Sequence, residues 1–178
     1  MSDVVLATPP SDRGINEITS LPPGDPTVEG FKFFVENTMQ VPTGSMPDDT
    51  TLQIAYDQAL NLAYWGLQSV PSQPTTPSIY AFAVYNLGCA FLLQFAQDDP
   101  TAQPPSTYWS DLRTKLGINS FSFGLINSAH DQGTSMAQYI PEQIRNMTLM
   151  DLQLAKSPWG MAYLMIAGQW GTIWGLTI

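Results

Sequence analysis

Charged side chains are scarce in this chain of 178 residues, since Asp, Glu, Lys and Arg together make up only 12%. That is about half of the usual share in globular proteins. A monomer with so few charges has difficulty covering its surface with well-solvated groups. We therefore expect much of the exterior to be covered by other protein chains, as in a subunit of a larger assembly.

Basic residues are the scarcer charged type, with six Lys and Arg against 15 Asp and Glu and a net charge of −9. The six are scattered along the chain rather than clustered. Tight binding of nucleic acid needs a basic patch that displaces counterions from phosphates. The sequence thus argues against nucleic-acid capture, whereas an acidic surface would suit a protein past which DNA slides without sticking.

Cysteine and histidine occur once each, as Cys89 and His130. A single cysteine excludes an internal disulfide, and within an apolar stretch the thiol should act as a small hydrophobe. A zinc site would need carboxylates for most of its ligands. The paired acids at 48–49 and 98–99 do not continue into a calcium loop, so we interpret them as helix caps or solvated turns. We expect no metal and no cofactor.

His130 and Asp131 could be offered, with a serine, as a hydrolase triad. No G-x-S-x-G turn precedes them and no apolar strand positions them, so a solvated loop histidine is the simpler interpretation. We expect no enzymatic activity. The N-terminus lacks a basic segment followed by an apolar core, so no signal peptide is predicted, and we expect synthesis in a reducing cytoplasm.

The longest uncharged region surrounds residues 78–97, SIYAFAVYNLGCAFLLQFAQ, and no charged residue lies between Asp57 and Asp98. A helix this apolar must be buried in a protein core or in a bilayer. Asn86, two glutamines and an acidic flank without a Lys or Arg anchor oppose a membrane span. We expect a buried core helix without membrane insertion, with a membrane protein of the holin type as an alternative.

Helical patterns precede and follow this segment, which predicts a mainly α fold: a small helical bundle at 27–178 behind an extended proline-rich arm at 1–26. A first helix should begin near the N-cap Thr27, and a second should run over 51–70 after Asp48 and Asp49. Its stripe of small and apolar residues should let another helix approach closely. It comprises Leu52, Ala55, Ala59, Leu62, Ala63 and Gly66. After 78–97, a short helix over 107–116 is expected between Ser106 as its cap and Gly117 at its end.

The period of the hydrophobic pattern changes at 118–126, where apolar residues partly alternate with polar or small ones, which predicts a strand. Residues 127–138 are polar and expected to be flexible. Together, 118–140 predicts a hairpin-like or extended projecting arm. A short helix is expected over 141–147, then a helix capped by Thr148 with Asp151, and a last one after Ser157-Pro158. Most of the five tryptophans are expected in the core. Residues 171–178 form an apolar C-terminal tail.

The order of these parts resembles a family of tailed-phage head–tail connector (adaptor) proteins of the helical-bundle kind. The features that carry the resemblance are the FKFFVENTMQVP helix, the P-D-x-x-x-L-x-x-A-x-x-x-A pattern of 47–59, and Tyr80, Ala83, Leu87 and Leu92 in the apolar helix. The last is the motif Ser157-Pro158-Trp159-Gly160 with Leu164, where the family commonly has Thr-Pro-Tyr-Gly.

The resemblance implies a non-enzymatic virion protein of the phage neck, made in the host cytoplasm, that forms a homo-oligomeric ring of twelve copies between portal and tail. DNA would pass through the ring without specific binding. The tail would bind the portal protein, and the arm would bind a neighbouring subunit or downstream tail and neck proteins. The tail residues expected at the portal are Trp170, Ile173, Trp174, Leu176 and Ile178; the arm residues are Phe121, Phe123, Leu125 and Ile126. A stopper or tail-completion protein is the alternative within the virion.

Overall fold

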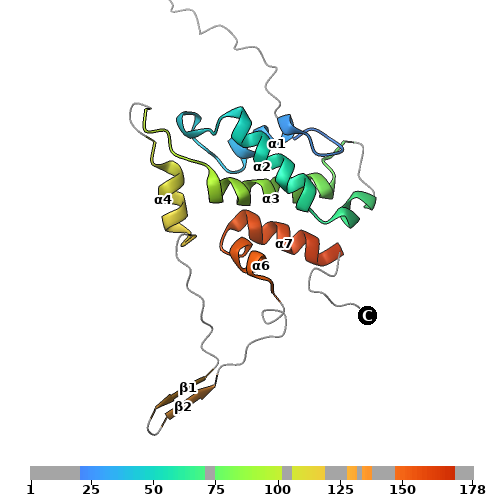
Figure 1. Cartoon of the computed structure of the whole chain (residues 1–178). Coiled ribbons are helices and arrows are strands. Elements are labelled where there is room, and N and C mark those ends of the chain that lie inside the picture. The colour runs from blue at the N-terminus through green and yellow to red at the C-terminus, as the bar shows by residue number, and fades with distance from the viewer. Residues whose placement is uncertain are drawn as a thin grey trace, which may run out of the picture.

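The protein is a small bundle of helices arranged around one central helix, α3 (Figure 1). The computed structural model describes residues 21–70, 75–101, 106–118, 128–131, 134–137 and 147–170. Helix α3 (Ile79–Phe95) lies between α2 (Asp49–Leu62) on one side and α7 (Pro158–Trp170) on the other. The mainly α fold predicted from the sequence is confirmed.

Burial of α3 is nearly complete around its whole circumference. Every residue from Ala83 to Leu93 is buried, and Ser78 caps the helix by accepting a hydrogen bond from the Ala81 amide at 3.0 Å. The buried side chain of Asn86 is hydrogen-bonded within the helix, because its amide donates to the Phe82 carbonyl at 2.8 Å. The segment that the sequence singled out is therefore the core helix, as predicted.

Helix α1 (Val28–Asn37) begins at its predicted cap, where the Thr27 hydroxyl accepts from the Gly30 amide at 3.0 Å. Its face of Phe31, Phe34 and Val35 is buried. A Cβ on Gly88 of α3 would lie 2.7 Å from the Phe31 ring. A side chain at position 88 would therefore prevent the observed contact with Phe31.

Helix α2 ends at Leu62, eight residues earlier than the sequence predicted. Ala63 is extended, and the chain then forms a short 3-10 helix, η2 (Trp65–Ser69). Glycine at position 66 lowers the helical preference here, and the bend buries Leu67, which is only 1% exposed. Within the predicted small-residue stripe the structure buries Leu52, Ala55, Ala59 and Ala63, and α3 packs closely against α2. Leu62 was wrongly assigned to that stripe, because it is 54% exposed.

Helix α4 (Tyr108–Lys115) ends as predicted, with Gly117 in the left-handed region at φ 64°. The prediction that Ser106 caps this helix is wrong. The Asp98 carboxylate reaches across from the end of α3 and accepts hydrogen bonds from the amides of Trp109 (2.7 Å) and Ser110 (2.9 Å). The Ser106 hydroxyl instead lies 2.7 Å from that of Ser45.

The C-terminal helices start at their predicted caps. Helix α6 (Leu149–Leu154) has a full capping box between Thr148 and Asp151. The Ser157 hydroxyl accepts from the Gly160 amide at 2.9 Å at the start of α7. The helix predicted over 141–147 lies outside the described residues, apart from Met147.

Two short antiparallel strands, β1 (Ser128–Asp131) and β2 (Thr134–Ala137), lie apart from the helices (Figure 1). They fall within 118–140, for which the sequence predicted a hairpin-like or extended arm, and they lie in its polar part, 127–138, which was expected to be flexible. His130 is part of β1 with its Cα opposite that of Ser135. Backbone pairing does not require apolar side chains, which explains why the alternation pattern missed it. The strand expected over 118–126 lies outside the described residues, apart from Ile118, which is in a turn.

The described end of the predicted N-terminal arm is attached to the bundle. Gly24 forms a parallel bridge with Pro77: its amide donates to the Thr76 carbonyl at 3.2 Å, and the Ser78 amide donates to the Gly24 carbonyl at 2.9 Å. Leu21 packs against the core. Residues 21–26 thus lie on the body of the same chain.

Candidate interaction surfaces

The contact residues predicted from the sequence fall at the edge of the described chain or beyond it. Trp170 is the last residue of α7. The other tail residues and the four arm residues lie outside the described segments; they are Ile173, Trp174, Leu176, Ile178, Phe121, Phe123, Leu125 and Ile126. The described surface nevertheless carries two apolar areas that the sequence reasoning did not single out.

The first apolar area is the outer face of α7, a helix whose sequence PWGMAYLMIAGQW contains no charged residue. Its buried residues include Tyr163, Leu164 and Ala167, and the helix packs on α3. Away from these positions, Met161 is 42% exposed and Met165 is 61% exposed. We call Met161, Met165 and the exposed Gly168 the methionine face. In the sequence, the spacing of four and then three residues between Met161, Met165 and Gly168 indicates one face of a helix, and this was the signal that could have revealed the methionine face.

The second apolar area lies where α2 ends. Trp65 is 76% exposed and Leu62 is 54% exposed. The Trp65 ring is tilted against that of Tyr64, with centroids 6.2 Å apart, and η2 contacts α7. Most of the tryptophans were expected in the core: Trp109 is fully buried and Trp159 is partly buried against the core, whereas Trp65 is exposed. Large exposed aromatic side chains are typical of protein interfaces.

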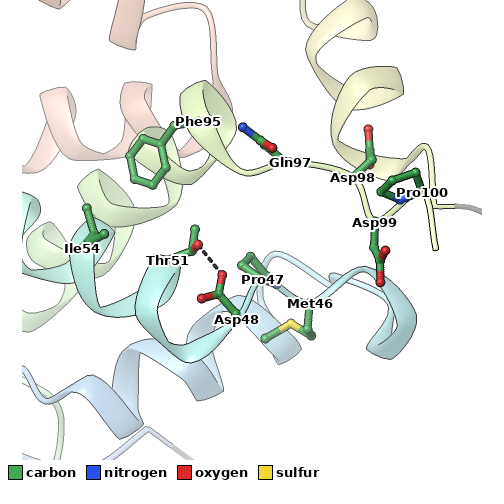
Figure 2. A pocket seen from close by; sticks show the side chains of 10 residues that line it. All are labelled: Met46, Pro47, Asp48, Thr51, Ile54, Phe95, Gln97, Asp98, Asp99 and Pro100. Carbon is green, nitrogen blue, oxygen red and sulfur yellow. Dashed lines mark hydrogen bonds between the residues drawn. The ribbon is translucent and has the colours of Figure 1, made fainter. Parts of the chain in front are cut away.

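A shallow cavity of about 540 Å³ separates the start of α2 from the chain that follows α3 (Figure 2). Three acids line it, together with Ile54 and Phe95. Asp48 accepts a hydrogen bond from the Thr51 hydroxyl, which lowers the pKa of the Asp48 carboxyl. Asp99 accepts from the amide and the hydroxyl of Thr101, at 2.8 and 2.6 Å.

Asp98 is the most strongly engaged of these acids. Burial opposes its ionisation, but hydrogen bonds from Trp109 and Ser110 and the charge of Arg113 together lower the pKa of the carboxyl. Arg113 in turn donates to the Ala96 carbonyl at 2.6 Å, at the C-terminal end of α3. The acids at 48–49 and 98–99 were predicted to be caps or turns, and Asp48 and Asp98 confirm it. No group of three potential metal ligands occurs within the segments that the structure describes.

Cys89 lies in the middle of α3 and is fully buried, and this burial raises the pKa of its thiol far above the ordinary value. A thiol in that state is a packing group rather than a nucleophile. Among the described helices, none combines the length and apolarity that a bilayer crossing requires. Helix α3 has 17 residues and packs against α1, α2, α4 and α7.

The chain was compared with known protein families, with curated proteins and with solved structures, and no match was found.

Proposed function

We propose that this chain is a structural subunit of a phage head–tail connector, and that twelve copies form a ring between portal and tail. The observation that carries the proposal is a helical bundle with exposed, uncharged apolar areas on α7 and around Trp65. The position between portal and tail is proposed because the order of the sequence motifs resembles that of the adaptor family.

Lateral contacts between subunits are assigned to the area around Trp65. Trp65 is 76% exposed on a short 3-10 helix, so a neighbouring subunit that covers it removes a large apolar side chain from water. Leu62 extends the same area by a second large apolar side chain. Buried residues of this type typically contribute about 2 kcal/mol or more when they lie at the centre of an interface.

The net charge of −9 fits a channel through which DNA moves. Phosphates are repelled by carboxylates, so an acidic wall would not retain the passing duplex. The portal would be bound by the tail, through Trp170, Ile173, Trp174, Leu176 and Ile178. The arm at 118–140 would reach a neighbouring subunit or a downstream neck protein.

The test is the mass of the assembled particle, measured by mass photometry and native mass spectrometry with and without the portal ring. Twelve chains of 19.6 kDa give about 235 kDa. We expect Trp65→Glu to prevent ring formation while its circular dichroism stays that of the wild type, and Trp65→Phe to assemble. A wild-type chain that stays monomeric even in the presence of the portal would overturn the proposal.

The alternative position in the virion is that of a stopper or tail-completion protein. Cross-linking followed by mass spectrometry separates the two roles. A connector subunit gives cross-links between residues 171–178 and the portal, whereas a component further down the neck gives cross-links to other neck proteins only.

A further inference from the structure

The area around Trp65 and the methionine face are two apolar surfaces that do not cover each other within one chain. Trp65 remains 76% exposed and Met165 remains 61% exposed, although η2 contacts α7. Both surfaces belong to uncharged stretches, because no charged residue lies between Asp57 and Asp98 or within α7. Exposed apolar surfaces of this kind mark contacts with other protein.

The two surfaces differ in a way that suits one to the other. Trp65 and Leu62 present a rigid indole ring and a branched side chain, 76% and 54% exposed. Met161 and Met165 carry long, flexible thioethers. Methionine adapts its shape to whatever covers it, and its sulfur makes favourable contacts with aromatic rings. A tryptophan from another molecule is therefore a suitable partner for the methionine face.

Charge favours a second copy of this chain, rather than a basic protein, as that other molecule. A basic partner is attracted by carboxylates, and neither stretch contains one. Two copies, each with a net charge of −9, repel each other and approach most easily through uncharged surfaces. A contact between the two apolar surfaces satisfies this condition on both sides.

A closed ring requires a contact between two different surfaces. A surface that pairs with itself produces a dimer, whereas head-to-tail contact between two surfaces continues from copy to copy until the ring closes. We infer that Trp65 and Leu62 of one copy pack on the methionine face of the next, against Met161 and Met165. This inference rests on the proposed function, from which it takes the ring, and it names the surface that receives Trp65.

The contact is tested by combining two variants, each of which destroys one surface. Trp65→Glu retains the methionine face, and Met165→Glu retains Trp65. We expect each variant alone to be monomeric, because every contact in the ring needs both surfaces. Their mixture should contain pairs of 19.6 kDa chains by native mass spectrometry, since one intact contact per pair remains. Met165→Leu keeps the face apolar and should assemble like the wild type.

Disulfide trapping identifies the positions that meet while Trp65 and Met165 stay in place. A Leu62→Cys chain is mixed with a Met161→Cys chain in oxidised glutathione, and the linked peptides are identified by mass spectrometry. In the matched control, Ile54→Cys replaces Met161→Cys, because Ile54 is 48% exposed on α2 and Met161 is 42% exposed on α7. We expect the link between positions 62 and 161 to form at least about tenfold faster than the link between positions 62 and 54.

Failure of this inference and failure of the connector proposal give different results. The inference is overturned if Met165→Glu assembles like the wild type, or if the link between positions 62 and 161 forms no faster than the control; a ring of wild-type chains then remains possible through other surfaces. If that link forms preferentially but the wild type never reaches the mass of a ring, even with the portal, the contact stands and the connector proposal is overturned. The trapping decides the case in which the mixed pairs dissociate before measurement.

Discussion

Asp98 caps the start of α4 although it lies 11 residues before Trp109 in the sequence. Replacing Asp98 should therefore destabilise the bundle measurably. In Asp98→Ala the amides of Trp109 and Ser110 both lose a charged acceptor, at present 2.7 and 2.9 Å away. Loss of a helix N-cap costs about 0.5–2 kcal/mol, and a hydrogen bond to a charged group contributes about 1.5–3 kcal/mol. Since water can partly replace the carboxylate at this half-buried site, we expect a loss of about 2 kcal/mol.

The assay is urea unfolding followed by circular dichroism, with thermal unfolding in parallel. A loss of about 2 kcal/mol should lower Tm by about 4–8 °C for a chain of this size. Asp98→Asn retains one acceptor oxygen and should lose about half as much. Asp99→Ala is the matched control, because the Asp99 side chain accepts from the amide and hydroxyl of Thr101 in an exposed turn rather than from amides at the start of a helix, and it should stay within about 0.5 kcal/mol of the wild type.

The pH dependence of this difference follows from the lowered pKa of Asp98. Its ionised form is stabilised in the folded state, so the contribution is fully present above the unfolded-state pKa of about 3.9. It is lost as the pH falls from that value through the lower folded-state pKa. The stability gap between wild type and Asp98→Asn should therefore be constant from pH 8 to pH 5 and narrow below about pH 4. A gap below 0.5 kcal/mol at pH 7, or one equal to that of the Asp99 control, would refute the capping role.

Further predictions concern the packing of α7 and α3. Gly160→Ala places a Cβ 2.2 Å from the Leu154 carbonyl oxygen, so the turn between α6 and α7 must shift, and urea unfolding should show a loss of about 2 kcal/mol. Gly168→Ala makes the same change on the exposed side of the same helix and should stabilise by up to about 1 kcal/mol; destabilisation by both would contradict the assigned faces of α7. The Cys89 thiol should react with a disulfide reagent at pH 8 at least about 1,000-fold more slowly in native buffer than in guanidinium chloride, because the thiol is exposed only when the bundle opens. Rapid labelling in native buffer would show that α3 is not the core.

The sequence predicted the helices best where a cap and an apolar pattern coincide. Thr27, Ser78 and Thr148 each precede such a pattern, and each caps its helix in the structure. Local hydrogen bonding and hydrophobic periodicity act over a few residues, so both are visible in the sequence.

The errors arose where distant contacts decide the local structure. Asp98 caps α4 in place of Ser106 because the fold brings the end of α3 next to the start of α4, and no local pattern encodes that proximity. The end of α2 depends on the burial of Leu67, which leaves Leu62 and Trp65 exposed. The scarcity of charge led us to expect an exterior covered by other chains, whereas the position of the exposed apolar side chains on α7 and η2 depends on how the helices pack.

The bridge between Gly24 and Pro77 has a mechanical consequence. Its hydrogen bonds join the chain just before α1 to the chain just before α3, at Ser78, the cap of the central helix. A pulling force applied to residues 1–20 would therefore load this junction before it reached the first turn of α1. If those residues were attached to a neighbouring molecule, tension would pass directly to the most deeply buried helix, and the bundle would resist as one body instead of unravelling from its first turn.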